Sequence, residues 1–325
     1  MVHLTITHKT SYRYREPVQL SPHRLMLRPR ESRDLKIVSS AMEISPDATV
    51  TWGHDVAGNA VATATFPFTS MTDRLVITCS TEVEHSAAAW PVFDIAASAI
   101  SFPFRYSDED WTDLGALSVM QHPDPGGRLA AWAQGFVWGR PTDTLSLLQD
   151  LSAGVAGALA YETRDDEGTQ SPLESLDRAA GSCRDFAVLF AEAVRSLGFG
   201  ARLVSGYLYD PGERLLGSQG AGTTHAWAEV YVPGAGWIPF DPTNRSMGGA
   251  NLVPVAVVRD IVQAVPVSGS YVGKPDAFAD MTVTVEVSGG SEDDEGGPTE
   301  VGAGERAGLA ETERTEPSRT SDDTA

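Results

Sequence analysis

Cys183 is the residue of this sequence with the clearest potential for nucleophilic chemistry. It follows Gly181 and Ser182 and opens a segment, residues 183–197, whose apolar side chains recur at helical spacing. A cysteine in the first turn of a helix lies next to unpaired backbone N–H groups and the positive end of the helix dipole, which stabilise a thiolate. Taken alone, Cys183 also fits the role of a small buried apolar residue, which is the role that we expect for Cys79 on its strand.

A histidine and an aspartate follow at the ends of two successive predicted strands. His225 begins a strand over residues 224–232, and Asp241 closes the next one. Taken alone, a strand histidine fits a place in the core, and an aspartate at a strand end fits a turn. Neighbouring antiparallel strands would, however, place His225 and Asp241 side by side, and a helix packed on that sheet can bring Cys183 to the same edge. This order predicts a nucleophile, a base and a residue that orients the base.

The motifs around these residues resemble those of the transglutaminase-like superfamily of papain-related cysteine enzymes. More narrowly, residues 1–287 resemble the bacterial proteins that join a β-rich transglutaminase N-terminal domain to this core. The resemblance implies that Cys183 is the nucleophile, His225 the base and Asp241 its orienter. We expect no cofactor and no metal ion. The matching motifs are Gly-Ser-Cys-Arg-Asp-Phe (181–186), Ser-Gly-Tyr (205–207), His-Ala-Trp-Ala-Glu-Val-Tyr (225–231) and Gly-Trp-Ile-Pro-Phe-Asp-Pro-Thr-Asn (236–244).

The chemistry that the resemblance implies is acyl transfer from an amide bond of a peptide or protein substrate, through a thioester on Cys183. With water as the acceptor the protein is a cysteine peptidase or amidase, which is our first hypothesis, and with an amine it is a protein-glutamine transglutaminase. The Cys183 backbone N–H is the natural first oxyanion donor, and Trp227 and Ser182 are candidates for the second. A non-catalytic binding protein on this scaffold is the remaining alternative, although such proteins usually lack the nucleophile or the base.

The elements that must position these residues indicate an α+β fold. Residues 1–87 alternate apolar and polar side chains with turn signals between them, such as Gly58-Asn59, and predict an N-terminal β-sandwich without chemistry of its own. The resemblance implies that a papain-like, transglutaminase-like core of helices packed on an antiparallel sheet follows. We divide the rest into a linker and helical segment (88–165), the catalytic core with its trailing strands (166–288) and a tail (289–325) that carries eleven acidic residues against three arginines and is predicted to be disordered.

Composition excludes several other classes of protein. The formal charge of −20 opposes binding to nucleic acids or to anionic membranes, and no apolar run approaches the ~18 residues that span a bilayer. The chain lacks paired metal-ligand motifs, and its glycine-rich loop, residues 217–222, lacks the Lys-Ser/Thr ending of a phosphate-binding loop. The N-terminus does not have the layout of a signal peptide, so we expect a cytoplasmic protein. The oligomeric state stays open.

Overall fold

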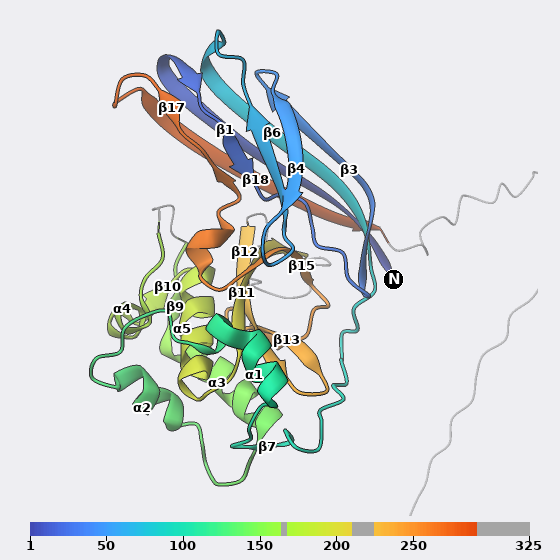
Figure 1. Cartoon of the computed structure of the whole chain (residues 1–325), viewed down its shortest axis with the longest axis vertical. Helices are drawn as coiled ribbons and strands as arrows, with labels where there is room; N and C mark the ends of the chain where they lie inside the picture. The colour runs from blue at the N-terminus through green and yellow to red at the C-terminus, as the bar shows by residue number, and fades with distance from the viewer. Residues whose placement is uncertain (164–167, 210–223, 291–325) are drawn as a thin grey trace, which may run out of the picture. The chain divides into compact units, whose positions relative to one another are not determined.

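The chain begins with strands that form two antiparallel sheets facing each other. A computed structural model describes residues 1–163, 168–209 and 224–290, so the tail beyond residue 290 and the glycine-rich loop at 217–222 lie outside the described residues. In the larger sheet the order is β17-β1-β6-β3, with β18 also paired to β1, and in the smaller sheet it is β16-β2-β5-β4 (Figure 1). The strands are β1 (Val2–Leu20), β2 (His23–Leu25), β3 (Leu35–Ser45), β4 (Thr49–His54), β5 (Ala60–Thr65), β6 (Met71–His85), β16 (Val267–Ser268), β17 (Tyr271–Val272) and β18 (Phe278–Gly290).

The two sheets enclose an apolar core, as the alternation of residue types predicts. Leu75 and Ile77 of β6 pack in one buried cluster with Leu25 of β2 and Ala62 of β5, which belong to the other sheet. The predicted hairpin turn joins β4 to β5, where Gly58 takes a positive φ of 73° that favours glycine. The N-terminal β-sandwich is therefore confirmed.

The strands that follow the core divide between the two parts of the fold. β15 (Leu252–Val258) pairs with β11 inside the core sheet. In contrast, β16 pairs with β2, and β17 and β18 both pair with β1, so the chain returns to the N-terminal sheets. The alternation of apolar and polar residues indicates that a segment is a strand, but it does not identify the strand with which it pairs.

The core is a five-stranded antiparallel sheet with helices packed beside it. Its order is β14-β13-β12-β11-β15, and α5 lies against β11 and β12 (Figure 1). Its other strands are β11 (Ala201–Leu208), β12 (Thr224–Val232), β13 (Gly236–Asp241) and β14 (Ser246–Met247). The helices are α1 (Asp108–Leu114), η1 (Gly115–Ser118), α2 (Arg128–Gln134), α3 (Thr144–Ala158), α4 (Pro172–Arg178), α5 (Cys183–Ser196) and η2 (Ile261–Ala264), and the two short ladders pair β7 (Ser101–Phe102) with β8 (Thr142–Asp143) and β9 (Ala160–Tyr161) with β10 (Ala180–Gly181).

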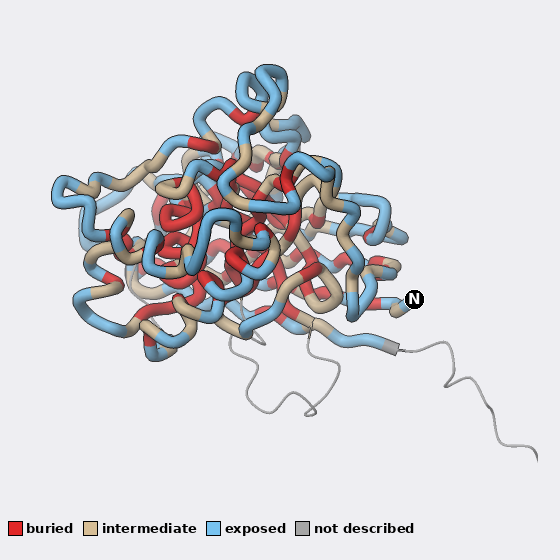
Figure 2. Tube along the Cα trace, turned by 90° about the horizontal axis from the view of Figure 1, so that it is seen from below, coloured by how far each residue is buried: buried red, intermediate tan, exposed pale blue. Residues whose placement is uncertain are grey.

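Helix α5 is the centre of this core. Almost all of its residues are buried, including both aromatic residues Phe186 and Phe190, and the buried segments of the chain gather in the interior (Figure 2). Phe190 contacts Phe240 of β13, with ring centroids 5.3 Å apart. The helix that carries Cys183 is thereby fixed against the strand that ends in Asp241.

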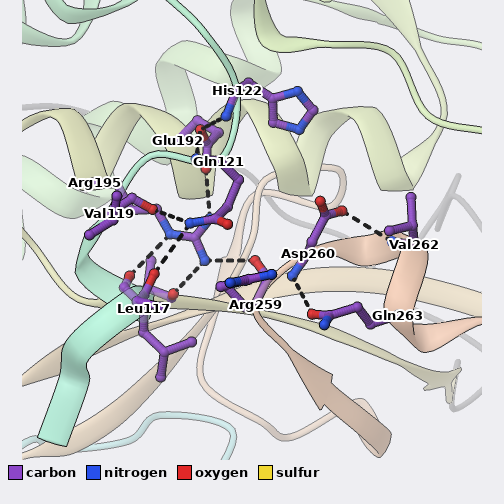
Figure 3. A network of polar contacts seen from close by, with 12 residues as sticks. Leu117, Val119, Gln121, His122, Glu192, Arg195, Arg259, Asp260, Val262 and Gln263 are labelled. Atoms are coloured by element: carbon purple, nitrogen blue, oxygen red, sulfur yellow. Dashed lines mark hydrogen bonds and ion pairs between the residues drawn. The ribbon is translucent and has the colours of Figure 1, made fainter.

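A buried ion pair anchors the far end of α5 (Figure 3). Arg195 donates to Glu192 at 2.6 Å, and it also donates to the carbonyl oxygens of Leu117, Ala201 and Arg259. The other Glu192 oxygen accepts the backbone N–H groups of residues 121 and 122. Because each charge is hydrogen-bonded to several elements, the pair ties α5 to the loop after η1 and to strands of the core sheet.

The N-terminal sheets contact the core through hydrogen bonds as well as apolar packing. Asn59, at the end of the β4–β5 hairpin, exchanges two hydrogen bonds with the backbone of Val257 in β15, at 2.8 and 2.9 Å. His8 of β1 lies within hydrogen-bond distance of Tyr207 of β11 (3.2 Å) and of Thr10 (3.0 Å). Burial lowers the pKa of His8 to about 4, so this imidazole is neutral at physiological pH.

Candidate active site

Cys183 is the first residue of α5, as the sequence predicts. Its side chain is buried, although the residue keeps 8% of its surface exposed. The turn before it is held by Asp185, whose Oδ2 accepts both the backbone N–H and the hydroxyl of Ser182, at 2.8 and 2.9 Å. Asp185 Oδ1 accepts the backbone N–H of Gln170 at 2.7 Å. A side chain at residue 181 would come within 2.7 Å of the Asp185 Cβ, which explains the glycine there.

His225, near the start of β12, and Asp241, at the end of β13, come together at one end of the core sheet. The Nε2 atom of His225 lies 2.8 Å from Oδ2 of Asp241, and each residue is only 1% exposed. The β12–β13 ladder pairs Ala228 with Phe240, so its register leads to Trp227 opposite Asp241 and to His225 one diagonal step away. The expectation that these two strand ends place a histidine beside an aspartate is therefore confirmed.

The Asp241 carboxylate accepts hydrogen bonds on both of its oxygens. Oδ1 accepts the backbone N–H groups of Thr243 at 3.0 Å and of Asn244 at 3.3 Å. Oδ2, the atom that faces His225, also accepts the side-chain amide of Asn244 at 2.8 Å. The turn Asp-Pro-Thr-Asn thus folds back on its own first residue, which is a known preference of aspartate in turns.

Electrostatics stabilise the charged forms of this buried pair. Burial by itself lowers the pKa of His225, but the Asp241 carboxylate and the neighbouring Cys183 side chain raise that pKa to about 10. Burial likewise raises the pKa of Asp241, but His225 and Asn244 outweigh this effect and hold the pKa below its usual value. The site therefore favours an imidazolium beside an ionised carboxylate.

The second ring nitrogen of His225 is the atom left for Cys183. Because Nε2 is engaged by Asp241, Nδ1 is the ring nitrogen available to Cys183, and this buried atom makes no aligned hydrogen bond to any residue that the structure describes. The Cys183 side chain is nonetheless close enough to raise the imidazole pKa. Long or poorly aligned contacts between a nucleophile and its base are common before substrate binds.

The two candidates for a second oxyanion donor differ in their surroundings. The Ser182 hydroxyl donates to Asp185, so it is not free to face a substrate. The Trp227 ring stacks on His225, with centroids 6.2 Å apart and an interplanar angle of 26°. Its indole N–H is buried and has no hydrogen-bond partner among the described residues. Trp227 therefore covers the imidazole, and only its N–H stays uncommitted.

Three further residues of the site had no predicted role. Asn244 donates a hydrogen bond to the Asp241 carboxylate, and Asp185 accepts hydrogen bonds from the turn before Cys183. Both residues stand inside motifs of the sequence. Tyr161 lies on β9, opposite Gly181 in a parallel ladder, and Cys183 and Asp241 are near enough to add to the effect of burial in raising the pKa of its phenol. A serine before Cys183 with an acidic residue three positions later is a capping signal that points to Asp185, whereas no pattern points to Tyr161.

Cys79 differs from Cys183 in its place in the fold and in its neighbours. It lies on β6, 3% exposed, with its sulfur 3.7 Å from the Thr81 hydroxyl. Burial raises the pKa of the Cys79 thiol. Its cross-strand neighbour His8 is neutral, so no imidazolium stabilises a thiolate there. We conclude that Cys79 is a core residue, as predicted from its strand.

No metal site or membrane span accompanies this arrangement in the described parts of the chain. Within residues 1–163, 168–209 and 224–290, no group of three or more His, Cys, Asp or Glu side chains is placed to hold a metal ion. In the same residues, no helix is long and apolar enough to cross a bilayer.

A helix that begins with a cysteine, packed on an antiparallel sheet that carries a paired histidine and aspartate, defines the architecture of papain-related cysteine enzymes. Comparison with known proteins specifies the family. Residues 4–84 match the bacterial transglutaminase-like N-terminal region, and residues 130–242 match the transglutaminase-like superfamily. Residues 130–242 therefore form a core of the transglutaminase-like superfamily, and residues 4–84 form an N-terminal region of the kind found in its bacterial members.

The individual relatives agree with this assignment. An uncharacterised protein of Mycobacterium leprae is 27% identical over 89% of this chain and 99% of its own length. A protein-glutamine gamma-glutamyltransferase of Pseudomonas aeruginosa is 31% identical over 30% of this chain, which is 14% of that protein. The crystal structure of a candidate cysteine protease from Cytophaga hutchinsonii superposes with a TM-score of 0.65 at 19% identity, covering 89% of this chain and 90% of that one. That superposition shows the shared fold.

Proposed function

We propose that this protein is a cysteine-dependent acyl-transfer enzyme that hydrolyses amide bonds of peptides or proteins. The observation that supports the proposal best is the placement of His225. Its Nε2 atom is held by Asp241, which leaves Nδ1 as the base for Cys183 at the start of α5. Superfamily membership supports the same class of chemistry.

In the proposed reaction, His225 Nδ1 holds the proton of the Cys183 thiol, and the sulfur attacks the amide carbonyl carbon as a thiolate. The Cys183 backbone N–H stabilises the resulting oxyanion. When the C–N bond breaks, the imidazolium returns its proton to the leaving amine, and a thioester remains on Cys183. Water, deprotonated by His225, then attacks the thioester, and the C–S bond breaks to release a carboxylic acid and to regenerate the thiol.

A second candidate differs only in the acceptor. In a protein-glutamine transglutaminase, a primary amine attacks the thioester in place of water. A segment that makes up 30% of this chain is similar to a protein-glutamine gamma-glutamyltransferase, which supports keeping this alternative.

The test is acylation by an activated ester, 4-nitrophenyl acetate, followed by intact-mass measurement and peptide mapping. We expect the native protein to gain one acetyl group on Cys183, and the Cys183→Ala variant to gain none there. A Cys79→Ala variant is the matched control and is expected to acylate like the native protein.

The acceptor is identified by moving the acetylated protein into buffer with or without a primary alkylamine. Loss of the acetyl group at the same rate in both supports hydrolysis, whereas amine-dependent loss with formation of the acetylated amine supports the transglutaminase. If the native protein acquires no acetyl group on Cys183, the enzyme proposal is wrong and the chain is a binding protein on this scaffold.

A further inference from the structure

We propose that Asn244 is a positioning residue of the site, which fixes the Asp241 carboxylate so that the proton of His225 resides on Nε2. This inference rests on the proposed function, because it assigns a role within the same Cys183–His225–Asp241 site. It begins from the Asn244 side-chain amide, which donates to Asp241 Oδ2 at 2.8 Å, the same oxygen and the same distance as the His225 contact.

The two carboxylate oxygens are held by different kinds of donor. Oδ1 accepts two backbone N–H groups of the turn, which almost any residue would supply at these positions. Oδ2 accepts the imidazole and the Asn244 amide, so the side chain at position 244 determines the surroundings of the oxygen that meets His225.

An amide donor at Oδ2 has a consequence for the imidazole. The amide N–H group donates a hydrogen bond, and it does not ionise at any pH at which proteins are folded. With both oxygens occupied as acceptors, the carboxylate has no proton of its own to offer, so His225 must present Nε2–H to it. The lone pair of the neutral ring is then on Nδ1, on the side of Cys183, where a base is needed.

The burial of Asp241 makes such a donor valuable. A carboxylate that is 1% exposed loses its hydration, and hydrogen bonds must replace the lost water. The Asn244 amide is among the groups that lower the pKa of Asp241 against the effect of burial, which agrees with the geometric argument. Asn244 is therefore expected to act on Cys183 only through Asp241 and His225.

The experiment measures the alkylation rate of Cys183 by iodoacetamide, mapped by mass spectrometry from about pH 5 to about pH 10, in the native protein and four variants. Asn244→Ala removes the donor. Asn244→Asp keeps the shape and replaces the donor with an acceptor. Asn251→Ala is the matched control, because that half-buried asparagine lies outside the site. His225→Ala shows the full effect of losing the base.

We expect Asn244→Ala to slow alkylation at neutral pH about tenfold or more, the usual effect of losing a hydrogen bond to a charged group. The midpoint of its rate profile should move to higher pH, while the rate at the highest pH and the melting temperature change little. A purely structural role would lower the melting temperature without moving that midpoint. Asn251→Ala should follow the native profile.

Asn244→Asp places two carboxylates side by side, which raises the pKa of one of them, so we expect an additional step in its profile. This variant carries the test if Asn244→Ala does not fold. If His225→Ala changes the profile while neither Asn244 variant shifts it, Asn244 is not a positioning residue and the proposed function stands. If His225→Ala itself leaves the profile unchanged, the proposed site is wrong and this inference falls with it.

Discussion

Replacing Asp241 with asparagine tests whether the proposed site depends on Oδ2, the carboxylate oxygen that meets His225 Nε2. The backbone N–H groups of Thr243 and Asn244 both donate to Oδ1, so the amide oxygen of the new side chain will occupy that position. Its NH₂ group then takes the place of Oδ2, 2.8 Å from His225 Nε2. Because an NH₂ group only donates, Nε2 must become the acceptor, and the ring proton moves to Nδ1, where it blocks transfer from Cys183.

The expected loss of reactivity is large. Burial lowers the pKa of His225, yet Asp241 and Cys183 raise it to about 10, so the imidazolium depends on the carboxylate. The equivalent substitution in the best-studied Ser–His–Asp enzyme lowers the rate about 10⁴-fold. We therefore expect Asp241→Asn to slow acylation of Cys183 by 4-nitrophenyl acetate about 10³-fold or more at neutral pH.

The assay follows nitrophenolate release and confirms the product by intact mass. Thermal unfolding of the variant provides the control, since the asparagine is nearly isosteric and the turn keeps its backbone hydrogen bonds. An acylation rate within about threefold of the native rate, in a folded variant, would refute the tautomer argument and remove Asp241 from the mechanism.

Three other outcomes are expected from the same structure. Brief exposure to iodoacetamide at neutral pH should modify Cys183 much faster than Cys79, and equal rates in the native protein would contradict the assignment of the nucleophile. The folded pKa of His8 is about 4, below the unfolded value of 6.5, so the unfolded state binds its proton first as the pH falls. Stability should therefore decrease between about pH 6.5 and about pH 4, by about 3 kcal/mol more than in a His8→Gln variant, as measured by urea denaturation. Glu192→Gln leaves the buried Arg195 without its counter-charge and should cost about 3–5 kcal/mol in the free energy of unfolding, and a loss below about 1 kcal/mol would show that the pair is not needed.

The sequence predicts the nucleophile and the paired His–Asp of this site because each stands at the end of an element. A helix start stabilises a thiolate whatever the tertiary structure, and two strands joined by a short turn must lie next to each other. Cys183, His225 and Asp241 follow from such local rules once their order along the chain and the resemblance of the surrounding motifs are added. The role of Asn244 does not, because it depends on the side-chain rotamer within one turn and on which carboxylate oxygen faces the ring.

Local sequence patterns also do not determine which strands the last strands of the chain pair with. The alternation of residues in β18 identifies a strand, but its pairing with β1 joins His3 to Gly290 across nearly the whole described chain. Such a pairing is decided by which sheet edge is open when the rest of the chain has folded, and no turn sequence encodes it. The sandwich was therefore predictable as a class, whereas its contribution from the C-terminal strands was not.

The nucleophile helix is fixed at both ends by buried carboxylates that have no place in the proposed reaction. Asp185 holds the first turn through Ser182 and Gln170, and Glu192 with Arg195 holds the last turn. Burying a carboxylate costs desolvation, and apolar side chains would bind the helix to the sheet at lower cost. Hydrogen bonds are directional, whereas apolar contacts are not. They therefore fix the helix in one rotation about its axis and one position along it, whereas apolar packing alone permits several. The proposed reaction requires the Cys183 sulfur to meet one ring nitrogen of His225, and this requirement would account for a helix that combines an apolar face with charged anchors.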